Sequence, residues 1–273
     1  MLMYDKFFPP KKIVLPNGKS IAERRSRFPL AVVLFLVALY VSLQFTGFDP
    51  QTIVKRWQQF FVIIQAMIPP NWSHTSSIIK PLLDTLKMSL LGSFLGSLTA
   101  IPVAFLASSN ILKSKLVHGL AKVFLTILRT MPTLVTALVA TFIFGLGTLA
   151  GTVAIYAFTL AYVGKLLYEQ IENTDMKAFE AMESLGMNRL QAFRYAIFPQ
   201  VLPNYLSTAL FCFEGNVRYA AILGYVGAGG IGLLLHEGLG WRDYASVGMI
   251  LLILALTVFL IEQISEHFRK RFI

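Results

Sequence analysis

EAMESLGMNRLQAFRYAIFP, residues 180–199, is the longest strongly amphipathic polar segment in an otherwise apolar chain. Its pattern predicts two short helices around a turn, because residues 180–185 favour helix and Gly186 can adopt the left-handed conformation that ends one. Asn188 then suits the N-cap of a second helix, with Gln191 three residues further on as in a capping box. The stretch therefore predicts a helical hairpin.

The second helix of this hairpin has an apolar side and a polar side. Leu190, Phe193 and Ile197 recur at a helical spacing and predict one buried stripe. Arg189 lies off that stripe, and Pro199 marks the entry to the next apolar run. A helical hairpin between two apolar runs is a shape suited to docking onto another protein, although a surface hairpin without a partner has the same pattern.

Composition places the whole chain in a membrane. The 273 residues include only 14% charged side chains, whereas soluble domains carry about 25%, and the mean hydropathy is +0.65. The net charge of +10 comes from short basic blocks between apolar runs, which favours the positive-inside rule over a nucleic-acid partner. One cysteine, Cys212, excludes an internal disulfide, and four scattered histidines show no metal-ligand spacing. We expect neither a metal site nor a catalytic site.

Hydropathy predicts an all-α integral membrane protein with six transmembrane helices. The apolar run at 130–164 is too long for one crossing, and Gly145, Gly147 and Gly151 mark the turn of a two-span hairpin. Gly92 and Gly96 form a GxxxG pair that permits close helix approach. The remaining spans are expected at 29–47, 88–107, 195–213 and 245–261.

The basic residues orient these spans. They are concentrated in the leader 1–28, the loop 108–122, residues 165–199 and the tail 267–273, so both termini and the hairpin are predicted to be cytoplasmic. The leader is long and no small-residue cleavage site follows it, which favours a retained first span over a signal peptide.

Residues 48–81 differ from the runs on either side. This segment is predicted to be an amphipathic helix at the membrane interface, interrupted by Pro69 and Pro70, with a short re-entrant span as the alternative. The core of the domain is expected at 83–266.

A charged pair lies inside the fifth apolar segment. Glu214 and Arg218 are four residues apart, so they share a helix face and can pair. Such charges usually face a bundle interior or a water-filled path: they either brace the helices or line a path where Asn216 and Arg218 meet an anion. The sequence GAGGIG that follows lacks a βαβ context and is no nucleotide site. The candidate translocation path comprises Glu214, Asn216, Arg218, Gly227, Gly229 and Gly230.

The hairpin resembles the "EAA" loop of bacterial ABC importers, in which Glu-Ala-Ala is followed at fixed spacing by Gly and Pro. Glu180, Ala181, Gly186 and Pro199 match, while Met182, Ala196 and Phe198 depart from the signature. The resemblance implies that the loop 170–199, with Arg189 on its polar side, forms the coupling helix that enters a cleft of an ATPase subunit.

From residue 83 to the end, the chain is similar to phosphonate ABC-transporter permeases. The matching pieces are Thr85-Leu86-Lys87-Met88-Ser89, Arg129-Thr130-Met131-Pro132, Gly164-Lys165-Leu166 with Glu169 and Glu172, and the run from Glu214 through Arg218 to Ile222–Gly232. Thr133 and Thr148 depart from the family pattern, which bears on the exact substrate. The resemblance implies the type I ABC importer permease core.

The resemblance also implies the partners. They are two copies of an ATPase that binds ATP and Mg, an extracytoplasmic phosphonate-binding protein, and a second copy of the same or a homologous permease in a bacterial inner membrane. This chain is expected to bind no cofactor itself, since Gly18-Lys19-Ser20 is not part of a complete phosphate-binding loop. The cargo would be a phosphonate, phosphite or phosphate. The rivals are a methionine-type importer permease and an ion-coupled secondary transporter, which should show a sequence repeat that this chain lacks.

Overall fold

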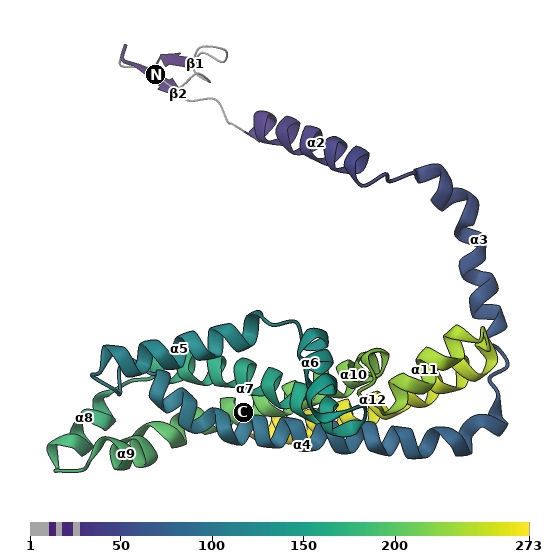
Figure 1. Ribbon diagram of the computed structural model, residues 1–273. Helices are drawn as coiled ribbons and strands as arrows, with labels where there is room; N and C mark the ends of the chain where they lie inside the picture. Colours follow the sequence, from purple (N-terminus) through teal and green to yellow (C-terminus); the bar gives the residue numbers. More distant parts are fainter. Residues whose placement is uncertain (1–10, 15–17, 24–27, 273) are drawn as a thin grey trace. The chain divides into compact units, whose positions relative to one another are not determined.

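The computed structural model describes residues 11–14, 18–23 and 28–272, and the chain divides into two compact units, Met1–Phe61 and Val62–Ile273 (Figure 1). In the first unit, β1 (Lys11–Val14) pairs with β2 (Ser20–Glu23) as an antiparallel ribbon in which Lys11 lies opposite Glu23. The sequence did not predict this ribbon within the basic leader. It is followed by α2 (Phe28–Phe45), which agrees with the expected first span.

Helix α3 (Pro50–Ala66) begins in the first unit and confirms that the segment after the first span contains a helix. Asp49 caps it, accepting hydrogen bonds from the Gln51 amide at 2.9 Å and the Thr52 hydroxyl at 2.6 Å. These bonds, that of Thr52 above all, lower the pKa of Asp49. The edge of the Trp57 ring meets the Phe61 ring with centroids 4.9 Å apart, an aromatic content suited to a membrane interface.

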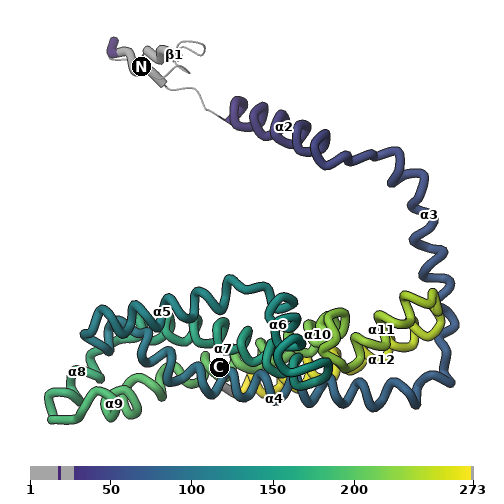
Figure 2. Tube along the Cα trace, in the orientation of Figure 1, coloured from purple at the N-terminus to yellow at the C-terminus, as the bar shows by residue number. Residues whose placement is uncertain are grey.

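The second unit begins at Val62, within the last part of α3, and is built on a helix pair. A short 3₁₀ turn (Trp72–His74) leads into α4 (Thr75–Ala107), so residues 75–81 belong to this long helix and not to the predicted interfacial segment. Helix α4 lies along α7 (Thr148–Glu172) in the same direction (Figures 1 and 2). A Cβ added at Gly92 would lie 2.8 Å from Ile155 Cγ2, and one at Gly96 would lie 2.7 Å from Thr159 Cβ. The predicted close approach at the GxxxG pair is confirmed.

The third predicted span starts too late in the sequence and misses a break in the helix. Residues Lys115–Thr130 form the amphipathic helix α5, and α6 (Thr133–Phe144) follows at an angle of 91°. The helix therefore starts well before residue 130 and breaks at Pro132, since a proline disfavours helical backbone in the residue before it. The expected turn into α7 is at Gly145 and Gly147, both with positive φ, whereas Gly151 is buried inside α7.

The chain then forms the hairpin α8 (Lys177–Ser184) and α9 (Arg189–Ala192), a π-helical turn (Phe193–Ile197), and α10 (Phe198–Leu223). A 3₁₀ turn (Gly224–Val226), α11 (Ile231–Gly240) and α12 (Tyr244–Phe272) complete it. Helix α12 continues through residues 267–272, so the predicted tail is the last part of this helix. Among the described residues five helices are long and apolar enough to cross a membrane, and six if α5 and α6 count as one broken span.

Candidate functional site

The turn of the hairpin is a Schellman motif. Helix α8 ends with the Met187 amide donating to the Met182 carbonyl at 3.2 Å and the Gly186 amide donating to the Glu183 carbonyl at 3.0 Å. Gly186 has φ +87°, in the left-handed region that glycine adopts at little cost. The predicted helix stop is confirmed, and its cause lies within six residues of sequence.

The start of α9 is the predicted capping box. The Asn188 side-chain oxygen accepts a hydrogen bond from the Gln191 amide at 2.9 Å, and the Gln191 side chain accepts one from the Asn188 amide at 3.1 Å. Helix α9 runs through the π-helical turn into α10, and Pro199 is the second residue of α10, directly after that turn.

The two faces of the hairpin differ from the predicted stripe. Phe193 and Ile197 are buried in the main core cluster, together with Phe179 of α8. Leu190 is 63% exposed, and Leu185 at the turn is 78% exposed. The π-helical turn after Leu190 carries an extra residue per turn, so the regular α-helical spacing of the predicted stripe is not kept as far as Ile197. The hairpin thus presents apolar side chains outward.

Glu180, Ala181, Gly186 and Pro199 are all exposed on this hairpin. The Arg189 side chain, by contrast, is held by contacts within the chain. Its Nη1 donates to the Ile111 carbonyl at 2.7 Å, and its Nε lies 3.3 Å from Glu183 Oε1. The guanidinium therefore fixes the tip of the hairpin to the loop after α4, a contact between residues far apart in the sequence.

A second set of bonds fixes that same loop to the end of α7. Glu172 Oε1 accepts hydrogen bonds from the Ser109 amide at 2.8 Å, the Ser109 hydroxyl at 2.6 Å and Lys122 Nζ at 2.8 Å. Asn110 Nδ2 also donates to the Ile171 carbonyl at 2.8 Å. The sequence singled out Glu172 only as part of a family pattern and gave no sign of these partners. The loop after α4 is held between α7 and the hairpin.

The predicted pair of Glu214 and Arg218 forms in α10, and α12 adds two more charges to it. Arg218 Nη2 lies 3.8 Å from Glu262 Oε2, and Arg269 Nη2 lies 3.9 Å from Glu214 Oε2. The Glu214 side chain is 6% exposed and that of Arg218 is 52% exposed. Sequence reasoning assigned Arg269 to a tail. Arg269 lies two helical turns after Glu262, and this spacing could have predicted that the two residues share one face of a helix.

Asn216 does not lie beside this pair. It is buried, and its Nδ2 donates to the Ser93 hydroxyl of α4 and the Thr159 hydroxyl of α7, both at 2.8 Å. In this structure Asn216 does not share a face with Arg218, because residues two apart on a helix point in different directions. Asn216 joins three helices instead.

The glycine run after α10 forms a compact corner. Gly227, Gly229 and Gly230 have φ values of +80°, +73° and +71°. The Gly227 carbonyl accepts a hydrogen bond from the Gly147 amide at 2.9 Å, and the Ile231 amide donates to the Thr85 hydroxyl at 2.7 Å. The corner therefore packs against the α6–α7 turn and α4, with a broken helix covered by protein.

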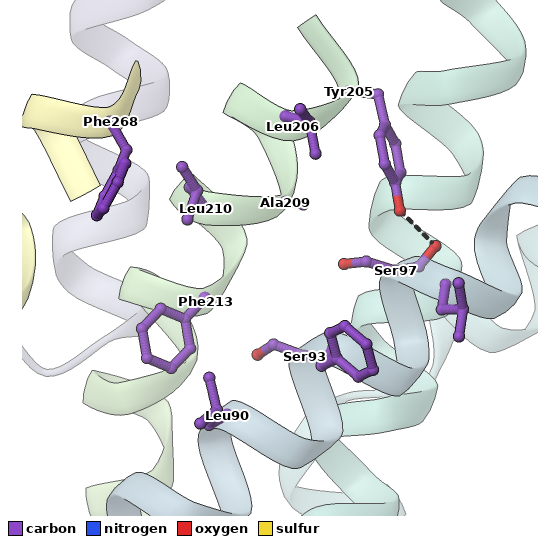
Figure 3. Close-up of a pocket in the computed structure, with 11 residues that line it drawn as sticks. Leu90, Ser93, Ser97, Tyr205, Leu206, Ala209, Leu210, Phe213 and Phe268 are labelled. Atoms are coloured by element: carbon purple, nitrogen blue, oxygen red, sulfur yellow. Dashed lines mark hydrogen bonds between the residues drawn. The ribbon is translucent and has the colours of Figure 1, made fainter. Parts of the chain in front are cut away.

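Two hollows flank α10. The larger, about 450 Å³, lies between α4, α10 and α12 and is almost wholly apolar; Tyr205 donates a hydrogen bond to the Ser97 carbonyl at its edge, and Phe268 of α12 also lines it (Figure 3). The smaller, about 340 Å³, lies between α7 and α10 and contains Arg218 among the rings of Phe158, Tyr162 and Tyr219. Of these two hollows, the smaller one contains a charged side chain.

A bundle of long apolar helices with a charged pair inside it and a protruding hairpin defines a multi-span membrane protein. The chain belongs to the family of binding-protein-dependent transport system inner membrane components, whose model matches residues 92–273. In this family of ABC transporter permeases, the ATPase is a separate subunit.

Individual relatives agree. The chain is 34% identical over 240 residues to a phosphite transport system permease protein of Stutzerimonas stutzeri, covering 88% of this chain and 86% of the relative. It is 31% identical over 220 residues to a phosphate-import permease protein of Mycolicibacterium smegmatis, covering 80% of this chain and 41% of the relative. The inward-facing methionine ABC transporter MetNI has the same fold, with a TM-score of 0.66 at 21% identity over 74% of this chain and 99% of that one.

Proposed function

We propose that this chain is the permease of an ATP-driven importer that carries phosphite, phosphate or phosphonate anions into a bacterial cell across the inner membrane. The observation that carries the proposal is the 34% identity to a phosphite permease over 88% of the chain. Arg218, half exposed in a hollow beside α10, supplies a cation suited to such an anion.

The hairpin is the proposed coupling element. Glu180, Ala181, Gly186 and Pro199 would face the ATPase, and the exposed Leu185 and Leu190 would be buried in its cleft. Two exposed leucines on one short hairpin support a protein contact at this place. Arg189 supports the hairpin from within the chain, so its role is to position the hairpin against the loop after α4.

The rest of the assembly follows from this role. Two ATPase subunits with ATP and Mg, an extracytoplasmic phosphonate-binding protein and a second permease copy, identical or homologous, would complete the transporter. Both termini would face the cytoplasm, and α3 would lie at the opposite membrane surface. The path would pass Glu214 and Arg218 and end at the corner formed by Gly227, Gly229 and Gly230.

The methionine-type alternative has less support. A probable D-methionine permease of Vibrio cholerae is 27% identical over 135 residues, covering 49% of this chain. The solved methionine transporter shares the fold at 21% identity, and fold alone does not fix a substrate.

The test is uptake by the reconstituted transporter. The chain is co-expressed with its proposed ATPase and binding-protein partners, and proteoliposomes are supplied with radiolabelled phosphite, methylphosphonate or methionine. We expect ATP-dependent uptake of at least one phosphorus anion and none of methionine. Methionine uptake without phosphorus uptake would favour the alternative, and uptake by the chain purified free of any ATPase would overturn the proposal.

A further inference from the structure

In the charge cluster between α10 and α12, formed by Glu214, Arg218, Glu262 and Arg269, some donor and acceptor atoms have partners among the described residues and others do not. Both ion-pair contacts of Arg218 use Nη2, so within the described part of the chain its Nε and Nη1 have no protein partner. Glu214 Oε1 is bound to Arg218, while its buried Oε2 accepts no hydrogen bond from the described residues. Within that part of the chain the guanidinium has two nitrogens without a partner and the carboxylate has one oxygen without a hydrogen bond, so both groups can take a further partner.

Arg269 is a second cation that could pair with Glu214. Its Nη2 lies 3.9 Å from Glu214 Oε2, too far for a hydrogen bond, and its buried Nε likewise lacks a partner among the described residues. The guanidinium lies over the Phe211 ring, 5.8 Å from its centroid, which keeps it beside α10. A small movement of α12 along α10 would complete the ion pair.

Arg218 also lines a hollow with room for an anion. The hollow of about 340 Å³ is walled by Phe158, Tyr162, Phe211 and Tyr219 and has room for a tetrahedral oxyanion. Arg218 presents donors in the planar arrangement that binds two oxygens of a phosphorus oxyanion at once. The apolar rings reduce the competition from water and strengthen the attraction.

We propose that this hollow is a subsite for a phosphorus oxyanion, and that Arg269 neutralises Glu214 when the anion takes Arg218. Before binding, Glu214 holds Arg218. After binding, the anion holds Arg218 and Arg269 holds Glu214, so the buried Glu214 carboxylate has a cation partner at both stages. Arg269 is a positioning residue in this exchange. The inference rests on the proposed function and adds the exchange of partners.

The probe is phosphite, with binding measured by equilibrium dialysis on the assembled permease–ATPase complex without the binding protein. Arg218→Leu should abolish saturable binding. Arg269→Leu should weaken it about tenfold, within the usual range of coupling between two sites, because Glu214 then has only Arg218. The double change Glu214→Gln with Arg269→Leu should restore binding, since nothing competes for Arg218.

Lys270→Leu is the matched control. It removes a positive charge from the same turn of α12, but Lys270 is 73% exposed and pairs with Glu266 at 2.7 Å. Surface changes away from the cluster act weakly. Phosphite affinity should therefore stay within about twofold of the wild type. Arg269→Lys should bind more tightly than Arg269→Leu. If Arg269→Leu does not assemble, Glu214→Gln alone decides: its affinity should equal or exceed that of the wild type, and a loss overturns the exchange.

Two results would refute the subsite itself. Unchanged phosphite affinity in Arg218→Leu would exclude it, as would an Arg269→Leu complex that binds normally. A lipid phosphate has the same chemistry, so the dialysis is repeated in nanodiscs with and without anionic lipid. Effects seen only with anionic lipid would assign Arg218 to a headgroup and overturn the proposal. Uptake by wild-type proteoliposomes tests the proposed function separately.

Discussion

Gly186 provides a direct test of the coupling hairpin. Its φ is +87°, and a Cβ added there would meet no heavy atom within 4 Å. Any effect of a side chain therefore comes from the backbone conformation and not from a clash. An L-residue in this region costs about 1–2 kcal/mol, most for a β-branched residue and least for Asn.

The size of the effect follows from that cost. A penalty of about 1–2 kcal/mol changes an equilibrium about 5- to 30-fold, and the apparent affinity for the ATPase falls by the fraction of hairpins left in the docking conformation. We expect the order Gly, Asn, Ala, Val from tightest to weakest. The membrane bundle should be unaffected, because Gly186 is exposed and packs on nothing.

The assay titrates purified permease variants with the ATPase subunit and measures both the dissociation constant and ligand-stimulated ATP hydrolysis. Gly119→Ala is the control, because Gly119 in α5 also has open space at its Cβ but no positive φ. It should behave as the wild type. If Gly186→Val binds the ATPase and stimulates hydrolysis as the wild type does, the hairpin is not the coupling element or does not need this turn.

Three other substitutions test the bundle and the loop after α4. Asn216→Leu removes two hydrogen bonds worth about 0.6 kcal/mol each in membrane proteins. The unfolding temperature should therefore fall while the affinity for phosphite stays unchanged. Weaker phosphite affinity at an unchanged unfolding temperature would instead place Asn216 in the path. Gly96→Leu should destabilise the helix pair by about 1–3 kcal/mol through overpacking against Thr159, seen as loss of monodisperse protein in detergent, and an unaltered unfolding temperature would contradict the packing. Glu172→Ala removes the hydrogen bonds that hold the loop at Ser109. The complex should still assemble, but ATP hydrolysis should depend less on the ligand. Hydrolysis that stays fully dependent on the ligand would show that these bonds are not needed for coupling.

Features with short-range causes could be predicted from the sequence. The Gly186 stop, the Asn188 cap and the pairing of Glu214 with Arg218 each depend on residues within six positions of one another, and the structure contains all three. The close packing at Gly96 was also predictable, because a glycine pair at this spacing removes the side chains that keep helices apart.

Long-range contacts came only from the tertiary structure. Whether Asn216 faces an open path or the hydroxyls of Ser93 and Thr159 depends on how α4, α7 and α10 are rotated about their axes, and periodicity alone leaves that rotation open. The contact of Arg269 with Glu214 likewise depends on where α12 crosses α10. Sequence by itself determined the class of fold and its local signals, because caps, turns and hydrophobic runs act over a few residues. Packing between distant helices decided which polar groups face each other.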